Sequence, residues 1–191
     1  VHTMPSRTTS SLMASAAGQR PTTTGQGYIP QDRPWTPEAY LELGNDYFQQ
    51  TKYYEAITLY RMFLQLYPMH HLAPRVAENI ALSYERQRRF DQAIAARGRL
   101  ANYVEGSQWY NANGSHPEAQ RYADTIARNS LHDTAIQYHQ QASELRSQAA
   151  ARRSANPLEA VELLRRANEK YGLAVQAYTQ FIQSYPNDEA A

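Results

Sequence analysis

YLELGNDYFQQTKYYEAITLYRMFLQLYP, residues 40–68, is the stretch of sequence that decides the fold. Its first half contains Gly44, and a helix with glycine at this position can approach a partner helix closely because no side chain separates the backbones. Its second half places apolar side chains three or four residues apart on one helix face: Ala56, Tyr60 and Phe63. Pro68 disfavours helical geometry in the residue before it. The stretch therefore predicts two helices packed as a hairpin.

The residues just before this stretch predict where the first helix begins. Thr36 is suited to the N-cap, Pro37 to the first helical position, and Glu38 to the positive end of the helix dipole. We expect the first helix to run to about residue 50. The second helix is expected to run from about residue 54 to residue 67.

A second helical hairpin is predicted 37 residues after the first. Four pairs of residues match at this offset: Gly44 with Ala81, Tyr47 with Tyr84, Ala56 with Ala93, and Phe63 with Leu100. The turn at residues 88–91 likewise matches the turn at residues 51–54. The two units are therefore expected at about residues 36–68 and 73–105.

A third unit is expected at about residues 117–186, after a loop of about ten residues at 106–116 that is long for a helix–helix connection. Residues 118–153 contain neither proline nor glycine, which predicts one long helix. Seven pairs then match at an offset of 118 residues: Tyr53 with Tyr171, Ala56 with Ala174, Tyr60 with Tyr178, Phe63 with Phe181, Leu64 with Ile182, Tyr67 with Tyr185, and Pro68 with Pro186. Seven matches at one offset are difficult to explain by chance.

Two arrangements fit the 27 extra residues of the third unit. In the first, both helices lengthen into an antiparallel arm, with one set of apolar residues facing another across the turn: Ala142, Leu145 and Ala149 against Leu158, Val161 and Leu164. In the second, a break at residues 168–171 makes 157–167 a short separate helix. Gly172 favours the break, whereas Glu162 and Arg165 fit the glycine and tyrosine positions of a unit poorly and favour the arm.

The order of the Leu-Gly, Tyr, Ala, Phe and Pro positions in residues 40–68 resembles the tetratricopeptide repeat, a helix–turn–helix unit of about 34 residues. The resemblance implies an all-α solenoid of helical hairpins over residues 35–191, with one elongated hairpin. Residues 1–34 are rich in Ser, Thr, Gly and Gln and are expected to be a disordered linker or tail. Because each solenoid unit buries its apolar face on the next, we expect a fragment of a longer repeat protein, with end-to-end repeat contacts possible.

The same resemblance implies a binding groove lined by the first helix of each unit. Counting from the matched residues, eight side chains should face it: Leu41, Asn45, Phe48, Gln49, Glu78, Leu82, Glu85 and Arg86. A groove that mixes leucine, phenylalanine and acids would suit an amphipathic helix or an extended peptide with basic and apolar anchors. The alternative for each residue is an ordinary solvated or intramolecular surface.

The composition argues against several classes of function. A formal net charge of +1 gives no whole-chain field that would attract nucleic acid, and no apolar run approaches the roughly 18 residues of a membrane span. The absence of cysteine excludes disulfides, thiol catalysis and thiolate metal sites within the chain. A basic run is interspersed with acids and predicts a solvated, partly salt-bridged face: Arg86, Arg88, Arg89, Arg97 and Arg99.

Catalysis and a cofactor are not expected. The chain lacks the nucleophile-elbow, zincin, phosphate-loop and dinucleotide motifs. His132 and His139 lie two turns apart on one predicted helix face, which is too far for the usual pair of metal ligands four residues apart. We predict that both histidines pack between helices or lie at the surface. A standalone enzyme that uses either residue is the alternative, and it would bind a metal or substrate.

The amino-acid sequence of the repeats is also similar to that of bacterial envelope repeat proteins. The phrase Tyr-x-x-Ala-x-x-x-Tyr-x-x-Phe-Leu/Ile-x-x-Tyr-Pro resembles the repeat lipoprotein of outer-membrane assembly and periplasmic repeat proteins of gliding motility and cell division. Residues 106–142 resemble the large repeat proteins of gliding bacteria. The resemblance implies a non-catalytic scaffold in the periplasm or at the outer membrane, with a cytoplasmic location as the alternative. A repeat module that regulates or supplies an enzyme domain elsewhere in the chain is the second hypothesis for function.

Overall fold

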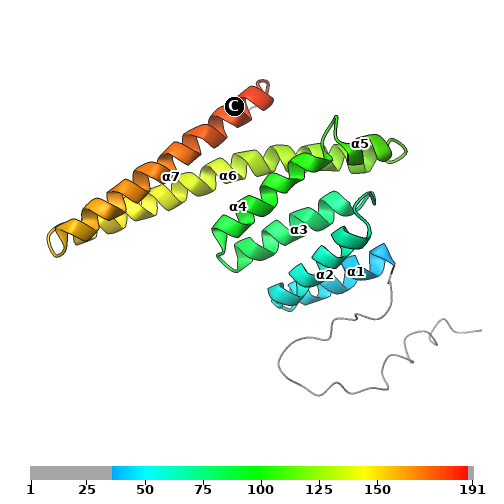
Figure 1. Cartoon of the computed structure of the whole chain (residues 1–191), viewed down its shortest axis with the longest axis horizontal. Coiled ribbons are helices and arrows are strands. Elements are labelled where there is room, and N and C mark those ends of the chain that lie inside the picture. The colour runs from blue at the N-terminus through cyan, green and yellow to red at the C-terminus, as the bar shows by residue number, and fades with distance from the viewer. Residues whose placement is uncertain (1–35, 189–191) are drawn as a thin grey trace, which may run out of the picture. The chain divides into compact units, whose positions relative to one another are not determined.

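The computed structural model describes residues 36–188, and these residues form helices and no strand (Figure 1). The predicted linker at residues 1–34 lies outside the described part. The elements in chain order are α1 (Pro37–Gln49), α2 (Tyr53–Leu66), α3 (Ala73–Arg86), α4 (Phe90–Gly98), the 3₁₀ helix η1 (Arg99–Tyr103), α5 (Gln108–Ala112), α6 (Pro117–Arg152) and α7 (Pro157–Ser184). The predicted all-α fold of helical hairpins with one elongated hairpin is confirmed.

The first hairpin, α1 with α2, begins and closes as its sequence predicts. Thr36 Oγ1 accepts a hydrogen bond from Ala39 N at 3.3 Å, and Pro37 occupies the first helical turn. Gly44 lies directly against the ring of Tyr60, and a Cβ atom at Gly44 would stand 2.4 Å from Tyr60 Cε1. Glycine is therefore the residue that allows α1 and α2 to pack at this distance.

The second hairpin, α3 with α4, repeats the backbone of the first. Thr51 and Arg88, which are 37 residues apart, both adopt the left-handed conformation, with φ of 61° and 58°. The residue after each of them closes its turn with a 2.9 Å hydrogen bond, from Lys52 N to Tyr47 O and from Arg89 N to Tyr84 O. The predicted alignment of these two turns is confirmed at the level of the backbone.

The left-handed turn at Thr51 gives a stability prediction. A β-branched residue is strained at positive φ, and glycine is not. We expect Thr51→Gly to raise the free energy of unfolding by about 0.5–1 kcal/mol, because relief of strain exceeds the added entropy of the unfolded chain. Gln50→Gly is the matched control: its φ is −78°, so the same glycine should destabilise. Chemical denaturation of both variants measures the difference, and equal losses would contradict the strain argument.

The segment after α4 differs from the prediction. In the unit expected at about residues 73–105, the second helix α4 ends at Gly98 and continues as η1, and the expected loop at 106–116 contains the short helix α5. Ser107 caps α5 by accepting a hydrogen bond from Tyr110 N at 3.1 Å. Trp109 is buried and donates from Nε1 to His70 O at 2.8 Å. This tertiary anchor holds a helix that is too short to be stable alone.

The elongated hairpin consists of α6, 36 residues long, and α7, 28 residues long. These two long helices lie side by side in Figure 1. Helix α7 is continuous through residues 168–171, so the predicted arm is observed and the alternative break is not. The turn between the helices is fixed by Asn156, whose Oδ1 accepts a hydrogen bond from Glu159 N at 3.2 Å.

The predicted packing of this hairpin is wrong in its register on α7. The residues expected to face α6 are exposed: Leu158, Val161 and Leu164. Helix α7 buries Ala160, Leu163 and Ala167 instead. The reason lies in α6, which buries an alanine at every seventh residue: Ala135, Ala142 and Ala149. Small residues on both helices allow close backbone approach, so this part of α7 turns its alanines and Leu163 inward and leaves its other large apolar residues outside.

The sequence match at an offset of 118 residues is also a structural match. Helices α2 and α7 end with the same 2.8 Å hydrogen bond, from Tyr67 N to Phe63 O and from Tyr185 N to Phe181 O. The Tyr53 ring packs edge-on against Phe48 of α1, and its counterpart Tyr171 packs edge-on against His139 of α6. Helix α7 is therefore the structural equivalent of α2, and the C-terminal part of the hairpin repeats the first unit.

Candidate protein-binding groove

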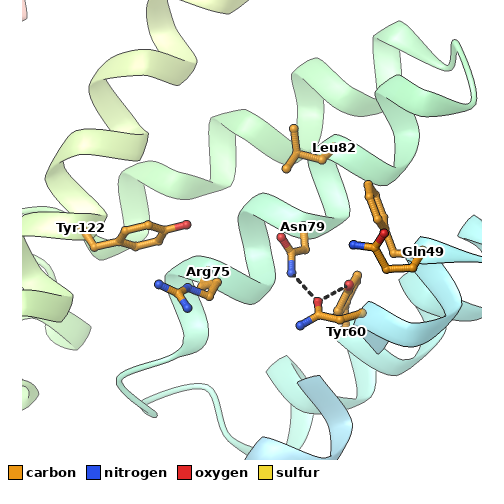
Figure 2. Close-up of a pocket in the computed structure, with 8 residues that line it drawn as sticks. Gln49, Tyr60, Arg75, Asn79, Leu82 and Tyr122 are labelled. Atoms are coloured by element: carbon orange, nitrogen blue, oxygen red, sulfur yellow. Dashed lines mark hydrogen bonds between the residues drawn. The ribbon is translucent and has the colours of Figure 1, made fainter. Parts of the chain in front are cut away.

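A cleft of about 370 Å³ lies between α1, α3 and the start of α6. Eight residues line it: Asn45, Phe48, Gln49, Tyr60, Arg75, Asn79, Leu82 and Tyr122. Figure 2 shows Arg75 and Tyr122 toward one end, Asn79 in the middle, and Gln49 and Leu82 toward the other end. Because α1, α3 and α6 are the first helices of their units, the cleft lies on the surface that the repeat pattern predicts for binding.

Three side chains form a hydrogen-bonded centre. Asn45 Oδ1 accepts from Tyr60 Oη at 2.8 Å and from Asn79 Nδ2 at 3.1 Å, and Figure 2 shows both bonds. Burial raises the pKa of Tyr60 to about 12, so this hydroxyl is a proton donor at neutral pH. With Oδ1 occupied twice, the Nδ2 of Asn45 is the group of this amide that can donate to a ligand.

One end of the cleft is cationic. The Arg75 guanidinium lies 5.0 Å from the centroid of the Tyr122 ring, a distance typical of a cation–π contact. Tyr122 Oη donates to Glu78, and burial together with this bond raises the pKa of Tyr122 to about 12. The protonated phenol bonds the Glu78 carboxylate, and Glu78 is not among the residues that line the cleft. Arg75 remains exposed and can meet an anionic group.

The other end of the cleft is apolar. Leu82 is among the exposed large hydrophobic residues of the described part of the chain. Phe48 is partly buried, and its ring is held by an edge-on contact with Tyr53 at 5.2 Å between centroids. A fixed aromatic ring beside an exposed leucine can receive an apolar side chain without first losing much conformational freedom.

The structure places four of the eight predicted groove residues in this cleft: Asn45, Phe48, Gln49 and Leu82. Leu41 is only 8% exposed and belongs to the core. Glu78 bonds Tyr122, and Glu85 pairs with Arg97 at 2.8 Å, so both carboxylates are turned toward partners of their own. Arg86 is exposed but lies outside the lining.

Four lining residues are absent from the set predicted from the sequence: Tyr60, Arg75, Asn79 and Tyr122. The groove residues of α3 were predicted by counting from the residues that match in α1. That procedure assumes that equivalent residues of the two helices face the same surface. Helix α3, however, has α1 on one side and α6 on the other. Arg75, Asn79 and Leu82 share one helix face at spacings of four and three, and this periodicity is the signal that could have identified them.

The two histidines predicted to pack between helices or lie at the surface both contact α7: His132 is partly buried, and His139 is exposed. The His132 ring is 5.3 Å from the Phe181 ring, and His139 is 5.5 Å from Tyr171. Over residues 36–188, no group of three or more His, Cys, Asp or Glu side chains is arranged to hold a metal ion. Among the same residues, no helix combines the length and the apolar character needed to cross a bilayer.

Comparison with known proteins gives one match. Residues 38–68 match the family model described as Tetratricopeptide repeat. No curated protein and no solved structure gives a significant match. The match covers the first hairpin, and the all-helical architecture of residues 36–188 is consistent with a helical repeat fold of the tetratricopeptide-repeat type. Repeats of this family generally mediate protein–protein interaction and are typically non-catalytic.

Proposed function

We propose that the chain is an interaction module whose cleft between α1, α3 and α6 binds a peptide segment with an acidic and an apolar anchor. The observation that carries this proposal is the lining itself: Arg75 at one end, Leu82 at the other, and amide groups between them. The cleft volume of about 370 Å³ suits one or two side chains of a bound segment.

The charge of the lining sets the expected ligand. The sequence pattern predicts a basic anchor, because it places Glu78 and Glu85 in the groove. Both acids are occupied elsewhere, by Tyr122 and by Arg97. The one formal charge in the lining belongs to Arg75, so an acidic group of the ligand gains a charge-assisted hydrogen bond there.

The amides supply contacts that do not depend on ligand side chains. Asn45, Gln49 and Asn79 are the amide residues of the lining. Asparagine and glutamine can bond a peptide backbone with both donor and acceptor groups. Asn45 is fixed by Tyr60 and Asn79, so it loses little entropy on binding. An extended segment fits this pattern, with its backbone on the amides and its side chains at the two ends.

Peptide selection tests the proposal. A displayed peptide library selected on the 191-residue chain should yield sequences with an Asp or Glu a few residues from a large apolar residue. Arg75→Ala and Phe48→Ala should each weaken a selected peptide at least tenfold, which corresponds to about 1.4 kcal/mol. Asn45→Ala should also weaken binding while the helical content is retained. Titration calorimetry and circular dichroism measure both quantities.

The matched control is Arg86→Ala, since Arg86 is an exposed arginine of α3 outside the cleft lining. This variant should bind a selected peptide as the unchanged chain does. Peptides whose affinity falls equally with Arg86→Ala and Arg75→Ala would show that binding depends on overall charge. Peptides insensitive to Arg75, Phe48 and Asn45 would place the binding surface elsewhere.

We further propose that the partners belong to a bacterial envelope complex of the gliding-motility or outer-membrane assembly type, in the periplasm or at the outer membrane. Support comes from the sequence. The motif that ends in Tyr-Pro occurs twice, 118 residues apart, and residues 106–142 resemble in sequence the large repeat proteins of gliding bacteria. Fractionation of the native cells should find the protein with periplasmic or outer-membrane markers. Recovery with cytoplasmic markers would overturn the proposed location.

A further inference from the structure

Helix α7 has a second apolar face, separate from the face that it buries against α6. Val175 is 64% exposed and Ile182 is 48% exposed. They lie seven residues apart and therefore share one side of the helix. Within residues 36–188, the main packing partner of α7 is α6. Exposed apolar residues on one side of a helix indicate a contact surface. The partner that covers this surface has to be identified from other features of the chain.

The repeat shows how such a face is covered. At the offset of 118 residues, Val175 corresponds to Ile57 and Ile182 corresponds to Leu64. Ile57 is only 4% exposed, and α3 packs directly on α2. Leu64 packs against a buried cluster that includes Ala77 of α3. The face that is exposed on α7 is therefore buried on its equivalent, α2, by a helix with the residue pattern of α3.

The chain contains a second helix with the pattern of α3. At the offset of 37 residues, Ala39 and Leu43 of α1 correspond to Val76 and Ile80 of α3. Val76 and Ile80 are buried, whereas Ala39 and Leu43 are only partly buried. Helix α1 thus carries the covering face, and α7 carries the face to be covered, at opposite ends of one unit.

The charged residues of α1 are all acidic: Glu38, Glu42 and Asp46. Glu38 and Glu42 correspond to Arg75 and Asn79, which lie on the side of α3 that faces the preceding first helix. The edge of α6 beside the α7 face carries Arg128, whose guanidinium is paired with Asp188 at 3.0 Å beyond the end of α7, and His132, which contacts Phe181. The contact with α1 therefore rests on the match of apolar positions, because Arg128 already has an acidic partner.

From these matches we infer that the chain associates head to tail with a second copy of itself: α1 of one copy covers Val175 and Ile182 on α7 of the next, as α3 covers α2 within the chain. The two surfaces in this contact are different, so the interface is heterologous and each added copy leaves one face open at each end. The assembly is consequently an open row of copies whose mean length rises with protein concentration.

Sedimentation velocity of the purified 191-residue chain tests the inference. The weight-average mass should rise steadily up to roughly 200 µM, where an interface of micromolar affinity is well occupied. Val175→Glu should weaken association at least tenfold with unchanged circular dichroism, because Val175 is exposed in the single copy. Leu158→Glu is the matched control: Leu158 is 85% exposed on the same helix but lies outside the proposed contact.

A mixing experiment tests the head-to-tail arrangement itself. Glu42→Lys changes the exposed edge of α1 and leaves α7 intact, whereas Val175→Glu changes α7 and leaves α1 intact. At a concentration where the unchanged chain associates and a tenfold weaker contact does not, each variant alone should be mostly a single copy, and an equimolar mixture should form a one-to-one dimer that grows no further. If two copies instead met symmetrically through α7 alone, mixing the two variants would not restore association of Val175→Glu.

The remaining outcomes overturn the inference. A single-copy mass for the unchanged chain at every concentration would show that the faces do not meet. Equal loss of association in Leu158→Glu and Val175→Glu would place the contact at the hairpin tip. Association that Val175→Glu leaves unchanged would exclude the α7 face. Peptide binding to the cleft is measured separately, so failure here leaves the proposed binding function standing.

Discussion

Replacement of Gly44 with alanine lowers the free energy of unfolding by about 1–3 kcal/mol, the range typical of overpacking in a core. At an exposed helical position the same change would stabilise the chain by up to about 1 kcal/mol, because alanine is the better helix former. The sign reverses here because the added methyl group would stand 2.4 Å from Tyr60 Cε1. The Tyr60 ring is completely buried and its hydroxyl is bonded to Asn45, so it has little room to move aside.

Gly172→Ala is the matched control, since Gly172 lies inside helix α7 and no neighbouring atom stands within 4 Å of the point that an added Cβ would occupy. This variant should be more stable than the unchanged chain. Gly44→Trp should unfold the first hairpin altogether and reduce the helical signal. Thermal melting by circular dichroism measures all three variants. A stabilising Gly44→Ala would show that α1 and α2 are not in the described contact.

Replacement of Arg97 with methionine should cost about 2–3 kcal/mol of unfolding free energy, since it breaks a buried polar network. Arg97 is 7% exposed and joins three helices: it bonds Gln137 Oε1 of α6 and Glu85 Oε2 of α3, each at 2.8 Å, from its place on α4. Glu85 is partly exposed and regains water when Arg97 is lost, whereas the buried Gln137 keeps an unsatisfied amide.

Two further variants separate this network from general surface effects. Arg99→Ala removes an exposed arginine two residues away and should change stability by less than about 0.5 kcal/mol. Arg97→Met combined with Gln137→Leu should recover most of the loss, because an apolar pair of similar volume avoids the unsatisfied group. Urea denaturation gives the three free energies. If Arg97→Met alone lowered the free energy of unfolding by no more than Arg99→Ala does, the network around Arg97 would add no stability.

The fold was predictable because its signals are local. Gly44 permits the close packing of α1 on α2, and the Tyr-Pro dipeptides end α2 and α7, so each signal follows from the chemistry of one or two residues. The short helix α5 was not predictable in this way, since it depends on the distant contact between Trp109 and His70. The face of α7 was misassigned because large apolar residues were assumed to point inward, whereas the alanine pattern of α6 decides the packing.

The candidate site was predictable only in part for a related reason. Asn45 and Gln49 of α1 are among the predicted groove residues that line the cleft. Helix α3 packs on α2, α4 and α6, and sequence position alone does not say which side chain of α3 faces which of these helices. Arg97 illustrates the same limit: its basic neighbourhood predicted a solvated face, yet three helices enclose it. Contacts between residues far apart in the sequence determine where these side chains lie.

The length of α6 has a mechanical consequence. Tyr122 of the cleft lies near the start of this helix, and about 45 Å of uninterrupted backbone separates it from the turn at Arg152. The helix is held near its start, where Tyr122 meets Glu78, and again at Gln137, which Arg97 of α4 bonds. Beyond Gln137 about 22 Å of α6 projects, so a tilt of about 5° at Gln137 would swing the tip by about 2 Å. Load applied to the tip would in turn be felt first at the bond between Arg97 and Gln137.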